Sequence, residues 1–156
     1  MSDYGTLTEL NGRYQLTFER FTLKNPEHVF SVLTDSYSFS KWYPFATGEM
    51  NLALGGKIVF DDEEGSIYYA TITELREPYL FSFREIDDLV SISLEENNGC
   101  TIQFTHTFDD VSWAVNTAVG WHRCLDVFLQ MVNGEPLQWR DKTADLHHYY
   151  SKAFKS

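Results

Sequence analysis

The 156-residue chain has only two cysteines, Cys100 and Cys124, and no Asn-x-Ser/Thr sequon. Two cysteines in a chain of this length do not make a disulfide framework. The first residues carry neither a basic start nor an apolar run, so no signal peptide is indicated. No segment approaches the about 20 apolar residues of a membrane span. These absences predict a soluble cytoplasmic protein.

Basic residues are also scarce. The chain has 12 Lys and Arg against 23 Asp and Glu, which gives a formal net charge of -11. Such a chain repels nucleic-acid phosphate and anionic membranes, so we expect neither as a partner. It also lacks a Gly-rich phosphate loop, a nucleophile elbow and the spacing of zinc ligands. We therefore expect no cofactor and no metal.

Aromatic residues, in contrast, are abundant. The chain contains 12 Phe, 9 Tyr and 4 Trp, and 43% of its residues are hydrophobic. This composition argues against disorder and permits an aromatic-lined pocket. The length fits one domain that buries a sizeable core. We expect a single domain over residues 1–156.

The hydrophobic pattern changes its period along the chain. Residues 13–23 alternate as a strand does, and Asn25 and Pro26 then suit the start of a helix. A second short helix is expected before Pro44, and short strands with tight turns follow up to residue 108. Residues 111–132 have helical periodicity, and Asn133-Gly134 is a typical helix end.

The order of these elements predicts an α+β helix-grip fold. In this fold a curved antiparallel sheet wraps around the long C-terminal helix, and a cavity lies between them. Two short helices follow the first strand. The last residues predict a short C-terminal helix that is docked through Trp139, Leu146 and Tyr150.

Five stretches carry a resemblance to a known family. In chain order they are "FERFTLKNPEHVFSVLTDSYSFSKWYPF", "GGKIVF", "ATITELREPYLFSF", "CTIQFTHTF" and "GWHRCLDVFLQMVNG". Together they resemble the Hsp90 ATPase activator homologue family of the START-like, or Bet v 1-like, helix-grip superfamily. The resemblance covers residues 13–134 and leaves 135–156 as a C-terminal extension. It implies the fold and a cavity, in a superfamily that includes lipid and hormone carriers, polyketide cyclases and co-chaperones.

Two histidines are candidates for chemistry. His122 and Cys124 stand two apart on the long helix, so their side chains diverge by about 160° and cannot form a dyad or chelate one metal. We expect His122 at the edge of the cavity and assign Cys124 a structural role. His106 shares a strand face with Phe104 and Phe108, so its imidazole is expected in an apolar pocket. There it serves as a polar handle, as a general acid or base, or as a core histidine.

Other clusters are less promising. The carboxylates of "DDEEG" (residues 61–65) are expected in a solvated loop, where neither burial nor close approach raises a pKa. His147 and His148 are adjacent, so their side chains diverge and do not form a metal site. The aromatic residues carry more information, and the expected ligand-binding lining consists of Trp42, Tyr43, Phe45, Phe60, Tyr69, Phe81, Phe83, Phe104, His106, Trp121, His122, Leu125 and Phe128.

Three functions remain open at this point. The first is binding of a small hydrophobic or aromatic molecule, or a lipid, in the cavity. The second is regulation of a chaperone ATPase, which the family resemblance implies. The third is a cyclase-like or hydrolase-like enzyme that uses His106, and an enzyme is the less favoured reading. Either a monomer or a homodimer is compatible with the sequence.

Overall fold

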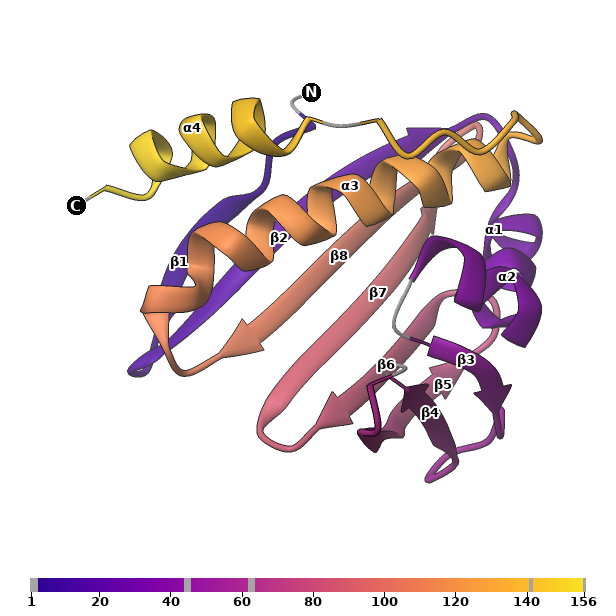
Figure 1. Ribbon diagram of the computed structural model, residues 1–156. Helices are drawn as coiled ribbons and strands as arrows, with labels where there is room; N and C mark the ends of the chain where they lie inside the picture. The colour runs from indigo at the N-terminus through magenta and orange to yellow at the C-terminus, as the bar shows by residue number, and fades with distance from the viewer. Residues whose placement is uncertain (1–2, 44–45, 62–63, 141, 156) are drawn as a thin grey trace.

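The computed structural model describes residues 3–43, 46–61, 64–140 and 142–155. Figure 1 shows a curved antiparallel sheet with one long helix, α3, lying across its concave face. The fold is α+β and matches the helix-grip architecture that the element order predicts. None of the helices in these ranges is both long and apolar enough to cross a membrane.

Eight strands form the sheet in the order β1-β2-β8-β7-β6-β5-β4-β3, and every neighbouring pair is antiparallel. Six of them form the predicted meander after the short helices. Strand β1 was not expected from the sequence and adds to the outer edge of β2. The strands are β1 Thr6–Leu10, β2 Arg13–Thr22, β3 Ala46–Met50, β4 Lys57–Asp61, β5 Ile67–Arg76, β6 Leu80–Glu85, β7 Asp88–Glu96 and β8 Cys100–Phe108.

The helix ends follow the predicted capping residues. Helix α1 (Pro26–Thr34) begins with Pro26, and the Asn25 side chain accepts a hydrogen bond from the backbone N–H of His28. Helix α2 (Ser36–Trp42) follows at once. Helix α3 (Ala114–Val132) comes after a short 3₁₀ turn, η1 (Val111–Trp113), and its chain leaves through Gly134 at φ 70°. Glycine adopts this left-handed conformation without steric penalty.

The core lies between α3 and the concave face of the sheet. One side of α3 presents Ala118, Leu125 and Phe128, and these side chains are at most 1% exposed. Aromatic side chains from the sheet and from α2 fill the space opposite them. As a result, much of the space in which a deep cavity was expected is filled by packed side chains.

The C-terminal segment turns back along α3 and ends in helix α4 (Thr143–Ala153), which packs near the N-terminal residues of the chain (Figure 1). Leu146 and Tyr150 are buried, as expected for a docked helix. Trp139 differs from the expectation, because it precedes α4 and is 41% exposed. Its indole lies against the guanidinium of Arg123 at 5.9 Å.

Candidate functional site

A pocket of about 850 Å³ lies at one end of the layer between the sheet and α3. Its wall comes from the β6–β7 hairpin, the end of β8, η1, the first turn of α3, the start of β5 and the residue after α2. The lining residues are Tyr43, Tyr68, Glu85, Ile86, Asp87, Asp88, His106, Phe108, Asp109, Asp110, Trp113 and Thr117. The pocket therefore combines aromatic walls with several carboxylates.

His106 lies at the inner part of this pocket with both ring nitrogens engaged. The indole N–H of Trp121 donates a hydrogen bond to Nδ1 at 2.8 Å, and Nε2 lies 3.0 Å from Oδ2 of Asp88. Because Nδ1 accepts the hydrogen bond from Trp121, the ring N–H of His106 is on Nε2 and donates to Asp88. The imidazole offers no free nitrogen to a substrate, so this geometry does not favour the acid–base role.

Tyr43 connects the pocket to the core. Its ring stacks on Trp121, with centroids 5.1 Å apart and planes 19° apart, and it also contacts the ring of Phe60. Burial raises the pKa of its hydroxyl, and the negative charge of Glu85 acts in the same direction. The phenol therefore stays protonated and can donate a hydrogen bond at the pocket wall.

Several carboxylates of the wall have protein partners. The guanidinium of Arg13 pairs with Asp109 and also donates to the backbone carbonyl of Asp87, which ties the β6–β7 hairpin to the start of β2. Asp110 caps η1, and hydrogen bonds from the side chain and backbone of Ser112 lower its pKa. Glu85 differs, because burial raises its pKa and the nearby Asp88 adds to this shift.

Most of the residues expected as a lining belong to the packed core. Each is at most 1% exposed, and none borders the pocket; they are Trp42, Phe60, Phe81, Phe83, Phe104, Leu125 and Phe128. Trp121 is 7% exposed and reaches the site through His106. The described structure thus places these side chains behind the pocket, while Tyr43 and His106 line it.

Two further residues were expected in the lining, Tyr69 and Phe45. Tyr69 is 57% exposed, since it lies on the outer face of β5, opposite the buried Ala70. Tyr68, and not Tyr69, lines the pocket, so the expected position was wrong by one residue. Phe45 lies outside the described residues. Sequence reasoning also missed Glu85, Asp88, Trp113 and Thr117, although Phe108 was on the face assigned to His106.

His122 lies in a different place, on the side of α3 that faces the C-terminal segment. Its Nδ1 is 2.9 Å from the hydroxyl of Tyr150, and its Nε2 is 3.7 Å from Oδ2 of Asp126. Burial lowers the pKa of His122, although Asp126 opposes the shift. Cys124 is buried, and burial raises the pKa of its thiol to about 12, so it stays protonated at neutral pH. The two side chains have separate surroundings.

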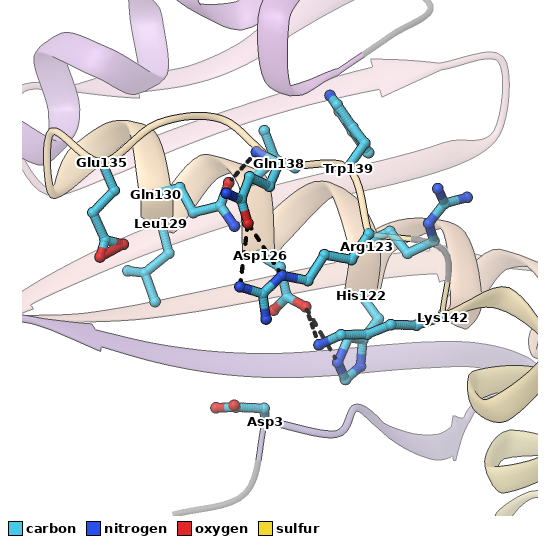
Figure 2. A pocket seen from close by; sticks show the side chains of 12 residues that line it. Asp3, His122, Arg123, Asp126, Leu129, Gln130, Glu135, Gln138, Trp139 and Lys142 are labelled. Carbon is cyan, nitrogen blue, oxygen red and sulfur yellow. Dashed lines mark hydrogen bonds and ion pairs between the residues drawn. The ribbon is translucent and has the colours of Figure 1, made fainter.

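A second pocket, of about 230 Å³, borders His122 and the segment between α3 and α4. Figure 2 shows His122 and Lys142 converging on Asp126, which also pairs with the buried guanidinium of Arg20 at 3.3 Å. Arg20 donates in addition to the backbone carbonyl of Asp3. These contacts hold β2, α3 and the C-terminal segment together. Among the described residues, no group of three metal-ligating side chains is suited to a metal ion.

Comparison with known proteins places the chain in a family. Residues 24–133 match the model of the family described as activator of Hsp90 ATPase homolog 1-like protein. The chain belongs to this family. The matched region includes every pocket residue from Tyr43 to Thr117, whereas Arg13 and the C-terminal residues Lys142 and Tyr150 lie outside it.

Solved structures of low sequence identity share the fold of this chain. A conserved protein of unknown function from Enterococcus faecalis has a TM-score of 0.83 at 16% identity, over 95% of this chain and 88% of that one. CalU16 from Micromonospora echinospora has a TM-score of 0.76 at 18% identity, over 99% of this chain and 98% of that one. The Aha1 dimer from Colwellia psychrerythraea has a TM-score of 0.63 at 18% identity, over 76% of this chain and 95% of that one. No curated protein matches the chain.

Proposed function

We propose that the protein binds a small molecule with a hydrophobic or aromatic body in the pocket beside His106. The observation that carries the proposal is the pocket itself, whose volume of about 850 Å³ lies in the usual range of small-molecule sites. Tyr43, Tyr68, Phe108 and Trp113 supply aromatic contact area. Apolar pockets with a few fixed polar groups are the general form of such sites.

The packing around the pocket supports a preformed site. Tyr43 is fixed by its stack on Trp121, and His106 is fixed by its two hydrogen bonds. A site whose side chains are already ordered loses little conformational entropy when a ligand enters. In contrast, Trp113 is 61% exposed at the mouth, where a ligand would cover it.

A fluorescence titration with N-phenyl-1-naphthylamine, an uncharged dye whose emission rises in apolar surroundings, tests the proposal. We expect saturable binding. Thr117→Trp places an indole in the pocket from the first turn of α3 and should weaken dye binding at least about tenfold, the equivalent of about 1.4 kcal/mol. Asn116→Trp is the matched control, because Asn116 is exposed on the same helix and does not line the pocket.

Two results would contradict this function. One is an absence of saturable dye binding by the folded wild-type protein. The other is equal dye affinity in the Thr117→Trp and Asn116→Trp variants, because the dye would then occupy another surface.

We propose chaperone regulation as a second candidate function, and family membership is the observation that favours it. The Aha1 dimer among the similar folds is compatible with it. The test is titration of the protein into an Hsp90-type chaperone of the same host, with binding and ATPase rate measured together. A chaperone whose ATPase rate stays constant, with no complex at high micromolar protein, would exclude this role.

A further inference from the structure

The charge of the pocket wall restricts the ligand class further. Five carboxylate residues line the pocket, namely Glu85, Asp87, Asp88, Asp109 and Asp110. None of the lining residues in the described part of the chain is Lys or Arg. We infer that the pocket takes an organic cation, an ammonium group on an apolar or aromatic framework. This inference rests on the proposed binding function and adds the charge of the ligand to it.

The partners of the five carboxylates show which of them are available to a ligand. Asp109 pairs with Arg13, Asp88 accepts from His106, and Asp110 caps η1. The side chains of Glu85 and Asp87 make no hydrogen bond or ion pair with any residue that the structure describes. Glu85 is the last residue of β6 and the exposed Asp87 lies in the turn before β7, so this hairpin contributes two carboxylates without a side-chain partner to the pocket wall.

Glu85 is the more informative of the two. It is partly buried, and a partly buried carboxylate without a cation loses hydration that nothing in the protein replaces. Burial and the charge of Asp88 both raise its pKa, and the nearby His106 lowers it by a smaller amount. An ammonium group beside Glu85 would supply that partner, whereas an anionic ligand would add to the repulsion.

The aromatic side chains suit the same ligand. Trp113, Tyr68, Tyr43 and Phe108 line the same pocket as the carboxylates. The face of an aromatic ring attracts a cation, and cages of such rings together with carboxylates recognise alkylated ammonium groups. An ammonium compound with an apolar body would use both features of the wall, since its charge meets the carboxylates and its framework meets the rings.

Two alternative explanations for the acidic wall are less suitable. The carboxylates are spread around the pocket, and no three ligating side chains among the described residues are placed as a metal site requires. A purely solvating role does not explain the partial burial of Glu85. The net charge of -11 over the whole chain also attracts cations towards the protein and repels anions.

The experiment compares probes of similar shape and different charge. Benzyltrimethylammonium, its uncharged carbon analogue neopentylbenzene and the anion benzenesulfonate each compete with N-phenyl-1-naphthylamine at constant ionic strength. We expect the cation to displace the dye at a concentration about tenfold lower than the uncharged analogue, and the anion to be the weakest competitor. Calorimetric titration of the cation alone measures the same preference without the dye.

Variants of the pocket wall test whether its carboxylates cause the preference for a cationic ligand. Glu85→Gln and Asp87→Asn should each reduce the ratio of cation affinity to uncharged-analogue affinity by about threefold, the equivalent of about 0.6 kcal/mol. The ratio is formed within each variant, so a change in dye affinity does not enter it. Glu95→Gln is the matched control, because Glu95 is an exposed carboxylate near the opposite end of β7 and should leave the ratio unchanged.

The outcomes separate this inference from the proposed function. Equal displacement by the cation and its uncharged analogue would overturn the inference, while saturable dye binding would still support a ligand pocket. A cation preference that survives in both wall variants would also overturn it. If the dye does not bind, the proposed function fails, and the inference that rests on it fails with it.

Discussion

Trp121 on α3 donates its indole N–H to Nδ1 of His106 on β8 across 2.8 Å. This bond joins the helix to the sheet at the inner part of the pocket, and it leaves Nε2 as the nitrogen that carries the proton and faces Asp88. A polar chain of Trp121, His106 and Asp88 thus runs from the packed core to the pocket wall. Trp121 does not line the pocket, yet it positions the carboxylate of Asp88 through His106.

Trp121→Phe removes the donor and keeps an aromatic ring in its place. We expect the tautomer preference of His106 to weaken, because Nδ1 then has no N–H to accept from. The loss of a buried hydrogen bond and of ring volume should destabilise the fold by about 1–3 kcal/mol. The ¹³Cδ2 and ¹⁵N shifts of His106 report the tautomer, and denaturant unfolding reports the stability. Unchanged His106 shifts in the variant would contradict this bond.

Core and pocket aromatics should respond differently to truncation. Phe104 is 1% exposed and contacts the rings of Phe18 and Trp121, so Phe104→Ala should lower the free energy of unfolding by about 3–5 kcal/mol. Trp113 is 61% exposed, and Trp113→Ala should change stability by no more than about 0.5 kcal/mol while it weakens dye binding. Denaturant titration and dye titration of both variants measure the contrast. Strong destabilisation by Trp113→Ala would place this residue in the core instead.

The hydroxyl of Tyr150 holds α4 in place. It accepts from the backbone N–H of Gly5 at 2.8 Å and lies 2.9 Å from Nδ1 of His122. Burial raises its pKa to about 12, so it is protonated at neutral pH and can donate to His122. Tyr150→Phe leaves both buried partners unsatisfied and should lower stability by about 1–3 kcal/mol.

The control for Tyr150 is its neighbour on α4. Tyr149→Phe keeps the ring that stacks on Tyr4 at 3.7 Å and removes only a hydroxyl from a residue that is 39% exposed. We expect little change in the free energy of unfolding. Equal effects of the two variants would mean that ring packing, and not the Tyr150 hydroxyl, holds the helix.

Stability should depend on the protonation of His122. Its pKa in the fold is lowered from 6.5 by burial, an effect that the charge of Asp126 opposes and the charges of Arg20 and Lys142 reinforce. The unfolded chain therefore takes up the proton first as pH falls. The stability contributed by neutral His122 is complete above pH 6.5 and is lost as pH falls from there towards the lower pKa of the fold.

His122→Asn tests this dependence, because Asn offers an acceptor to Tyr150 and does not titrate. The stability difference between wild type and variant should shrink as pH is lowered from about 7.5 to about 5. His148→Asn, at an exposed position on α4, should leave the pH dependence of the wild type intact. A stability difference that is constant across this range would show that His122 titrates equally in the folded and unfolded chain.

The sequence predicted the architecture because the signals for it are local. Asn25 and Pro26 start α1, Gly134 follows the end of α3, and the alternation along β8 places His106 on the inner face. The strand β1 was missed because its residues are largely exposed and show no clear apolar alternation. The resemblance to the family was confirmed over residues 24–133.

The candidate site was less predictable because it depends on which aromatic rings pack against one another. Strand alternation distinguishes Tyr68 from Tyr69 only when the register is known, and an error of one residue reverses the face. Nor can periodicity separate Phe104, which is sealed in the core, from Trp113, which stands at the pocket mouth. Glu85 and Asp88 flank a turn, and only the pairing of β7 with β8 brings Asp88 to His106.

The contact between Gly5 and Tyr150 has a consequence for rearranging the chain. Because residues 5 and 150 touch, a short linker could join the chain at these two positions, and new ends could be opened in the exposed β7–β8 turn near Asn98. Circular permutation is tolerated where ends are close and the opened loop is exposed. A protein rearranged in this way would begin with β8 and run through α3 before the other strands, so that the element carrying His106 is made first.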